Sequence, residues 1–393
     1  MEQADSSPRK ADRVKLLHES SSETLMGKLL RKFWQPIARS ASVAKGQALT
    51  VRILGEDLTL YRGDSGAPYL VGGHCAHRGT VLHTGRVEAE QIRCMYHGWR
   101  YDRSGRCTQI PAEKRPRTEE VRIAGYPVHE YSGMVFAYMG QGSAPAFDLP
   151  RKDFLEQPGC HMFVREAIWD CNWFQQIENS LDAVHVSFVH VWGKFSRYGE
   201  EITTAIPELA YSETTAGIRQ VATRSKNNVR ISDWTFPNNN HIVQPGPKKG
   251  DPWSHTYVWV VPIDDQRTLR FTVYAFAASA AQVARQFADD PHREFNPADH
   301  HAQLFGAHTI PDVSAPEVLS AQDYVAQKGQ GVIADRMQEN LSTSDAGIAL
   351  LRKIFLRELE AIRRGRSTKQ WTKLAEEVHM PIPEGQLLQE EPH

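Results

Sequence analysis

The sequence contains no apolar run long enough to cross a bilayer, and its first fifteen residues are polar and of mixed charge. We therefore expect neither a membrane span nor a secretory signal peptide. The chain also has no excess of charge of either sign, because 46 basic residues stand against 47 acidic ones and the formal net charge is −1. This balance gives no electrostatic reason to expect a nucleic acid or a membrane surface as a partner.

Cysteine is scarce, with five residues in the chain. Two of them belong to a motif described below, which leaves Cys107, Cys160 and Cys171. An odd remainder without a secretion signal is typical of reduced thiols in the cytoplasm rather than of a disulfide framework. We therefore expect a cytoplasmic protein.

The length of 393 residues, with 40% hydrophobic and 24% charged residues, indicates a soluble globular protein of two or three domains. The Pro- and Gly-rich segment GQGSAPAFDLP, which ends at Pro150, is the clearest joint. We predict an N-terminal segment over residues 1–40, which contains an entry helix. A first domain is predicted over residues 41–150 and a second domain over residues 151–393.

The two sides of this joint differ in their patterns. Before it, TVRIL and DLTLY alternate between apolar and polar residues and are separated by glycine turns, which predicts a small β-sandwich. After it, HTYVWVVPI and LRFTVYAFA are expected to pair as a hairpin. The other elements predicted there are strands at 160–169, 202–222 and 227–237, a helix at 173–190 and an amphipathic helix at 345–364.

The stretch ENSLDAVHVSFVH, residues 178–190, places several ionisable groups among apolar residues. Such groups are costly to bury unless they pair or bind a metal. Asp182 and His185 stand three residues apart and would share one face of a helix. His190 would lie about 140° further round, at about 100° per residue. Both histidines can therefore reach one ion only if the helix is loosened or bent here. Taken alone, the stretch also fits an amphipathic helix with surface histidines.

A second cluster lies upstream, where Cys75-Ala-His77 is followed after sixteen residues by Cys94-Met-Tyr-His97. Two thiolates and two imidazoles suit a tetrahedral zinc ion. They also suit a Rieske [2Fe–2S] centre, in which the cysteines bind one iron and the histidines bind the other. The single-residue gap between Cys75 and His77 argues against an ordinary zinc finger, in which like ligands usually occur in pairs.

These motifs resemble those of a known family. C-x-H-R-G followed by C-x-Y-H-G-W, together with D-x2-H-x4-H, is similar to the signature of the Rieske non-heme iron oxygenases. The chain looks most like the large (alpha) oxygenase subunits of the phthalate-dioxygenase-like branch. The resemblance implies an α+β protein. An N-terminal all-β Rieske domain would precede an α+β catalytic domain with an antiparallel sheet around the iron-carrying helix.

The resemblance also implies two cofactors in each chain, a [2Fe–2S] cluster and a mononuclear Fe(II). Two histidines and a carboxylate form a facial triad that leaves positions open for oxygen. The implied ligands are Cys75, His77, Cys94 and His97 for the cluster, and His185, His190 and a distant acid for the iron.

Two residues beside the histidines carry further expectations. By the resemblance, Asp182 joins an iron-ligating histidine to a cluster histidine of a neighbouring copy of the chain, which would be His97. Asp182 also fits the rule that a ligating histidine gives its other N–H to a carboxylate. Asn179 lies three residues before Asp182, where it would orient a ligand or be an ordinary hydrogen-bonded asparagine.

Two acids are candidates for the third iron ligand. Asp323, in Ala-Gln-Asp-Tyr, resembles the acid that precedes a glutamine-rich helix in the family. Asp345, in Ser-Thr-Ser-Asp-Ala-Gly, stands where a helix needs an N-cap or first-turn acid, which is a sufficient reason for its presence. We prefer Asp323.

The implied function is that of a terminal oxygenase. Electrons would pass from NAD(P)H through a flavin and iron–sulfur reductase, or a ferredoxin, to the cluster and then to the iron. O2 would be used to hydroxylate or oxidatively dealkylate an aromatic substrate, by hypothesis an aromatic carboxylate. The resemblance implies a homotrimer, because the two centres of one chain lie too far apart for efficient transfer.

The alternative is a Rieske electron carrier or a zinc-stabilised binding protein without oxygenase activity. A carrier would need little beyond the first 150 residues. More than half of the chain, including D-x2-H-x4-H, would then have no purpose.

Overall fold

The computed structural model describes residues 10–190, 205–226, 228–244, 254–277 and 315–376. They form two units. The small-sheet unit comprises Glu19–Phe147 and Val261–Asp265, and the large-sheet unit comprises the described parts of Met1–His18, Asp148–Val260 and Gln266–His393. The chain thus passes between units close to the predicted joint at Pro150, and the predicted segment 1–40 is shared between the two units.

The small-sheet unit is built from short strands. They are β1 (Gln35–Arg39), β2 (Ala48–Ile53), β3 (Glu56–Arg62), β4 (Pro68–Gly72), β5 (Arg86–Glu88), β6 (Gln91–Arg93), β7 (Arg100–Tyr101), β8 (Cys107–Gln109), β9 (Gly125–Tyr126), β10 (Val128–Tyr131) and β11 (Met134–Ala137). Three sheets result, with the orders β2-β3-β4-β9, β1-β11-β10 and β5-β6-β7-β8. One short helix, α2 (Leu25–Leu30), begins after Thr24, whose hydroxyl accepts the N–H of Gly27.

The alternation predicted for this unit is present in the structure. In β2, Val51 and Ile53 are buried, whereas Thr50 and Arg52 are exposed. The strand therefore buries one face, as period-two patterning requires. The prediction of an all-β first domain is confirmed.

The large-sheet unit contains an antiparallel sheet of seven strands. They are β12 (Cys160–Trp169), β13 (Glu208–Glu213), β14 (Gly217–Ser225), β15 (Asn228–Thr235), β16 (Asn239–Gln244), β17 (Ser254–Pro262) and β18 (Thr268–Ala277). Their order is β12-β18-β17-β16-β15-β14-β13. The predicted strand at 160–169 is β12, and the predicted hairpin is β17 with β18, which are neighbours in the sheet.

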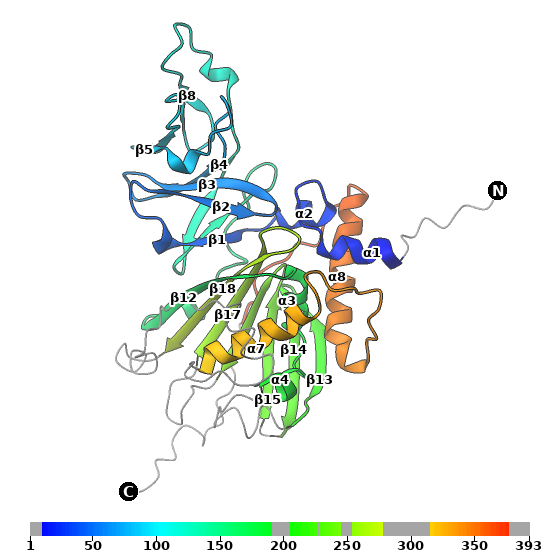
Figure 1. The fold of residues 1–393 in the computed structure, drawn as a ribbon. Helices are drawn as coiled ribbons and strands as arrows, with labels where there is room; N and C mark the ends of the chain where they lie inside the picture. Colours follow the sequence, from blue (N-terminus) through cyan, green and yellow to red (C-terminus); the bar gives the residue numbers. More distant parts are fainter. Residues whose placement is uncertain (1–9, 191–204, 227, 245–253, 278–314, 377–393) are drawn as a thin grey trace, which may run out of the picture. The chain divides into compact units, whose positions relative to one another are not determined.

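Helices accompany this sheet in the large-sheet unit. They are α1 (Lys10–His18), α3 (Trp173–Asn179), α4 (Val186–Val189), α7 (Ala315–Gly329) and α8 (Ala346–Arg363). In Figure 1, α3, α4 and α7 lie across one face of the large sheet. Within the described residues, no helix combines the length and the apolar character that a membrane span needs.

The prediction of one continuous helix over residues 173–190 is wrong. Helix α3 ends at Asn179 and α4 begins only at Val186. Asp182 lies in the break, where its Oδ1 accepts the N–H groups of Val184 (3.0 Å) and His185 (3.2 Å). A side chain that satisfies these donors competes with the helical hydrogen bonds. The break lies before His185, and the turn from His185 to His190 is helical, so the expectation that both histidines share one ion through a loosened helix stays a prediction.

Helix α8 is anchored by aromatic rings. The Phe355 ring lies 5.0 to 5.9 Å from the rings of Trp173, Phe174, Trp234 and Phe236, and all five side chains are buried. The contacts with Trp173 and Phe174 are edge-to-face, a geometry that adds to the hydrophobic gain of burial. The predicted amphipathic helix at 345–364 therefore packs through its apolar face.

A clamp connects α3 to the end of α7. The Gln175 side-chain amide donates to the carbonyl oxygens of Gln327 (2.9 Å) and Gly331 (3.0 Å). Its Oε1 accepts the N–H of Ala334 at 3.0 Å. Because Gln175 is buried, losing any of these partners would leave a polar group unsatisfied. The clamp therefore fixes the helix before the histidines against the helix that carries Asp323.

Buried charges reinforce the clamp. Glu178 pairs with Arg336 (2.7 Å) and with Arg352 of α8 (2.6 Å), and Arg352 pairs in turn with Glu339 (2.6 Å). Glu178 and Arg336 are both buried. A buried pair does not guarantee net stability, but removing one partner leaves uncompensated charge behind.

We predict that Glu178→Ala lowers the free energy of unfolding by about 3–5 kcal/mol, because two arginines lose their shared carboxylate in a buried site. Urea denaturation measures the loss. The control is Glu360→Ala, which removes an exposed helix acid paired with Arg363 and Arg364 and should leave the unfolding midpoint nearly unchanged. Equal stability of the two variants would contradict the prediction.

Candidate metal centres

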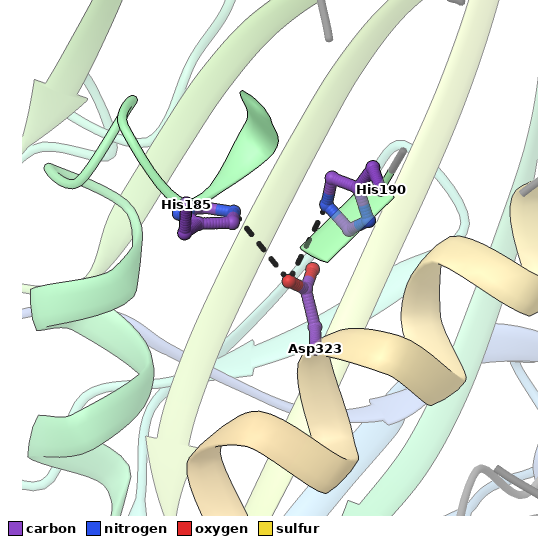
Figure 2. A group of neighbouring side chains, drawn as sticks. All are labelled: His185, His190 and Asp323. Atoms are coloured by element: carbon purple, nitrogen blue, oxygen red, sulfur yellow. Dashed lines mark ion pairs between the residues drawn. The ribbon is translucent and has the colours of Figure 1, made fainter. Parts of the chain in front are cut away.

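Three side chains of the large-sheet unit converge on one point. The Asp323 Oδ1 lies 3.5 Å from the Nε2 atoms of both His185 and His190. Figure 2 shows the two imidazoles turned toward the Asp323 carboxylate, which projects from α7. That oxygen is buried and accepts no hydrogen bond from the described residues. A buried carboxylate oxygen between two imidazole nitrogens is a donor set that fits a cation.

The histidines reach this point from the two ends of one short helical turn, α4. His185 directly precedes α4 and His190 directly follows it. The Asp182 Oδ1 accepts the backbone N–H of His185, and its Oδ2 lies 3.7 Å from the Nδ1 of the His185 ring. Asp182 therefore sets both the backbone turn and the surroundings of the His185 ring.

His190 is oriented by a residue that sequence reasoning missed. Its Nδ1 donates to the Oε1 of Gln322 at 3.0 Å, and both side chains are buried. The proton on Nδ1 leaves Nε2 with its lone pair directed at the Asp323 side. Burial lowers the pKa of His190, an effect that the nearby Asp323 carboxylate opposes. His190 is thus kept neutral, the form that can ligate a metal.

The two candidate acids have different surroundings. Asp323 lies within α7 rather than before it, so the expectation that it precedes its helix is wrong. Asp345 forms a capping box with Ser342: its carboxylate accepts the Ser342 N–H at 2.7 Å. This is the structural role that the sequence suggested for Asp345.

A cavity of about 110 Å³ opens beside the three side chains. Asn179 and Asp182 also line it. The strands contribute residues at alternate positions, all from one face of the sheet, and most are polar. They are Gln220, Arg230, Ser232, Asn240, Ile242, Thr256, Val258, Arg270, Thr272 and Tyr274.

The Cys–His motifs of the small-sheet unit form two similar loops. In each, a glycine N–H donates back to the cysteine carbonyl: Gly79 to Cys75 (2.9 Å) and Gly98 to Cys94 (3.1 Å). Both glycines have positive φ, 73° and 74°, a conformation that side-chain-bearing residues rarely adopt. The repeated turn places the two cysteines alike.

Cysteines and histidines of these loops differ in exposure. Cys75 and Cys94 are buried, His97 is half-buried and His77 is exposed. The two imidazole rings lie 4.5 Å apart, and His77 stacks on Trp99 at 4.6 Å. The thiols thus face the core while the imidazoles face outward.

This arrangement does not fit one zinc ion. Among the described residues, only His185, His190 and Asp323 bring three such ligand atoms within 4.8 Å of one another. A tetrahedral zinc site, with bonds of about 2.0–2.3 Å, would bring all four donor atoms that close. A two-iron cluster separates its cysteine ligands from its histidine ligands, which fits the observed spread.

The Tyr101 hydroxyl contacts the ligand loop and also escaped sequence reasoning. It lies 3.2 Å from the Cys75 Sγ and accepts the N–H of Ala76 at 3.1 Å. Burial raises the pKa of the Cys75 thiol, whereas the hydrogen bond from Tyr101 acts in the opposite direction. Tyr101 therefore stabilises the thiolate form that binds metal.

Comparison with known proteins identifies the family of the chain. The family model of the Rieske [2Fe-2S] domain matches residues 33–131. The oxygenase subunit of 5,5'-dehydrodivanillate O-demethylase from Sphingobium sp. (strain NBRC 103272 / SYK-6) is 35% identical over 363 residues, which cover 88% of this chain and 79% of that subunit. The alpha subunit of phenoxybenzoate dioxygenase from Ectopseudomonas oleovorans is 33% identical over 365 residues, covering 87% and 83% of the two chains.

A solved structure shares the fold. The terminal oxygenase of carbazole 1,9a-dioxygenase from Novosphingobium sp. KA1 superposes with a TM-score of 0.63 at 19% identity, over 86% of this chain and 93% of that chain. The chain belongs to the Rieske non-heme iron oxygenases, as an alpha oxygenase subunit of the phthalate-dioxygenase-like branch that carries one [2Fe–2S] cluster and one mononuclear iron.

Proposed function

We propose that His185, His190 and Asp323 hold the mononuclear iron of this oxygenase. The observation that carries the proposal is the buried Asp323 oxygen, 3.5 Å from both imidazole nitrogens and without a hydrogen-bond donor among the described residues. Gln322 holds His190 in the required tautomer. Two histidines and one carboxylate leave open positions on the metal.

The proposed ligands of the [2Fe–2S] cluster are Cys75, His77, Cys94 and His97. Their support is the pair of matching loops, with buried thiols and outward-facing imidazoles. An external reductase or ferredoxin supplies the electrons, ultimately from NAD(P)H.

Asp182 is proposed to link the iron site to His97 of a neighbouring copy of the chain, which requires a homotrimer. This link is supported by the 3.7 Å approach of the Asp182 Oδ2 to the His185 Nδ1 and by the partial exposure of the Asp182 side chain, 31%. Asn179, which lines the same cavity, is proposed to tune the site. A cytoplasmic location completes the proposal and is supported by five cysteines, none of which forms a disulfide.

The proposed substrate is an aromatic carboxylate that is hydroxylated or oxidatively dealkylated. The two relatives above are named for dehydrodivanillate and phenoxybenzoate, which are both aromatic acids. The cavity agrees with a polar substrate, because its sheet face bears two arginines and several neutral polar side chains.

Each part of the chain then has a defined task. When bound, the iron supplies the position at which O2 is activated with electrons from the cluster. His185 and His190 provide neutral nitrogen donors, and Asp323 provides one negative charge. The backbone turn at Asp182 and the Gln175 clamp position these groups, and reactive geometry tolerates displacements of only about 1 Å.

We predict that Asp323→Ala loses the mononuclear iron but keeps the cluster. Iron should fall from about three to about two atoms per chain while acid-labile sulfide stays at about two. Asp345→Ala is the matched control: it removes a helix cap, which costs about 1 kcal/mol of stability, and keeps all the iron. A full complement of mononuclear iron in the Asp323 variant would contradict the assignment of Asp323 as an iron ligand.

We predict that Asp182→Asn keeps both metals yet lowers turnover at least about 10-fold, because the amide still accepts the backbone N–H groups but lacks the charge that orients and couples the histidine. O2 uptake and product formation from aromatic acids, with a reductase and NAD(P)H, measure the effect and test the proposed function itself. The control is Asp335→Asn, an exposed residue whose Oδ1 accepts the N–H of Met337 in a similar turn. Near-normal turnover of the Asp182 variant would mean that electrons take another route.

We predict that Tyr101→Phe lowers the reduction potential of the cluster by roughly 40 mV. A hydrogen bond to a ligating sulfur stabilises the reduced cluster; we take about 1 kcal/mol for it and 59 mV per tenfold change for one electron. Spectroscopic redox titration measures the shift. Tyr61→Phe is the control, because the buried Tyr61 hydroxyl donates to the carbonyl of Glu90 instead. An unchanged potential in the Tyr101 variant would remove this residue from the cluster's environment.

A further inference from the structure

One cation in the active-site cavity stands apart from the other charged groups there. Arg270 extends from β18 into the cavity, together with Thr272 and Tyr274 at the next two alternate positions. Within the described part of the chain, its guanidinium forms no hydrogen bond and lies within 4.0 Å of no carboxylate. Burial lowers the pKa of Arg270, but a guanidinium remains charged in proteins.

The contact that Arg270 does make fixes its position. The guanidinium lies 4.6 Å from the centre of the buried Trp169 ring. Trp169 packs edge-on against Tyr324, at 5.4 Å and 80°, and Tyr324 directly follows Asp323. A stacked guanidinium keeps its N–H edge free to donate in its own plane. Arg270 is thus preorganised beside the proposed iron ligands.

The partner that Arg270 lacks among the described residues is one of opposite charge, an anion. Arg270 is half-buried, and a partly desolvated charge without a counterion is costly unless a ligand completes the pair. The Asp323 carboxylate interacts electrostatically with Arg270, but its Oδ1 is directed at the two histidines. A metal held there would neutralise that carboxylate and leave Arg270 as the uncompensated charge.

The second arginine of the cavity is a weaker candidate. Arg230 has further interactions within the protein. Its neighbour Arg224, whose pKa burial lowers to about 10, also repels it electrostatically. Arg270 has neither feature.

We propose that Arg270 binds the carboxylate of the substrate through its planar N–H edge and thereby directs the aromatic ring toward His185, His190 and Asp323. The proposal rests on the proposed function, in which an aromatic acid is the substrate of this site. A guanidinium matches a carboxylate in two parallel hydrogen bonds, so it selects acids over neutral analogues of the same shape.

The test compares acids with their amides by calorimetry on protein that contains both metals and is kept free of O2. The probes are benzoate, phthalate and 3-phenoxybenzoate, each beside the corresponding amide. The wild type should bind at least one acid about 10- to 100-fold more tightly than its amide, as expected for charge-assisted hydrogen bonds. Arg270→Gln should lose this preference, whereas its affinity for the amide should stay nearly the same.

Two further variants keep the test decisive. Arg270→Lys retains the charge and should retain part of the preference for the acid, which guards against a glutamine variant that fails to fold. Arg219→Gln is the matched control, because Arg219 lies on the same sheet, is paired with Asp233 at 2.8 Å and does not line the cavity. It should bind the acids as the wild type does.

The outcomes separate this inference from the proposed function. Equal affinity of the wild type for acids and amides, or unchanged acid binding in Arg270→Gln, would overturn the role of Arg270 even if aromatic acids are oxygenated. Acid binding that depends on Arg270, without any oxygenated product when reductase and O2 are supplied, would support the anion site and overturn the proposed reaction.

Discussion

The buried carboxylate of Asp323, directed at two imidazole nitrogens, is the constraint on which the large-sheet unit depends. Its three donor side chains come from segments about 130 residues apart in sequence, so the fold must hold two distant helices in register. Gln175 does so by hydrogen-bonding the backbone that follows α7. Glu178 adds charge pairing with Arg336 and Arg352. The proposed metal site is therefore specified by polar contacts that burial strengthens.

The large sheet serves the site through the period of its strands. In β18, Leu269, Phe271 and Val273 are buried on one face. The alternate positions turn a mostly polar face toward the cavity. One strand can thus contribute to the hydrophobic core and to the chemistry, because successive side chains point to opposite sides. The arginine that we assign to substrate binding depends on this alternation.

The small-sheet unit buries the two cysteine sulfurs of its Cys–His motifs and leaves the two imidazoles more accessible. Two glycines in the left-handed conformation give its loops the same turn, so the cysteines face the core and the histidines face outward. The Tyr101 hydroxyl lies 3.2 Å from the sulfur of Cys75, a proposed cluster ligand. An electron can leave such a centre through its histidines without exposing the sulfur ligands.

Sequence alone determined the family, the two-part organisation and the chemistry, because C-x-H-R-G, C-x-Y-H-G-W and D-x2-H-x4-H combine ligand types at specific spacings. Alternation along β2 likewise predicted a strand, since period-two burial is a local property. The spacing of Asp182, His185 and His190 also predicted a distorted helix. The spacing could not show that the helix stops at Asn179. That end depends on the orientation of the Asp182 side chain, which accepts backbone N–H groups in the folded structure and so competes with helical hydrogen bonds.

Tertiary structure decided what depends on distant partners. The sequence does not distinguish Asp323 from Asp345 by residue type. In the structure, Asp323 lies beside two histidines and Asp345 caps a helix. Gln322, Tyr101 and Arg270 have no motif, although Arg270 and Thr272 do interrupt an apolar strand at alternate positions. Whether such a side chain lies beside a metal ligand, a sulfur atom or an open cavity depends on how elements far apart in sequence pack together. A local pattern carries no information about that packing.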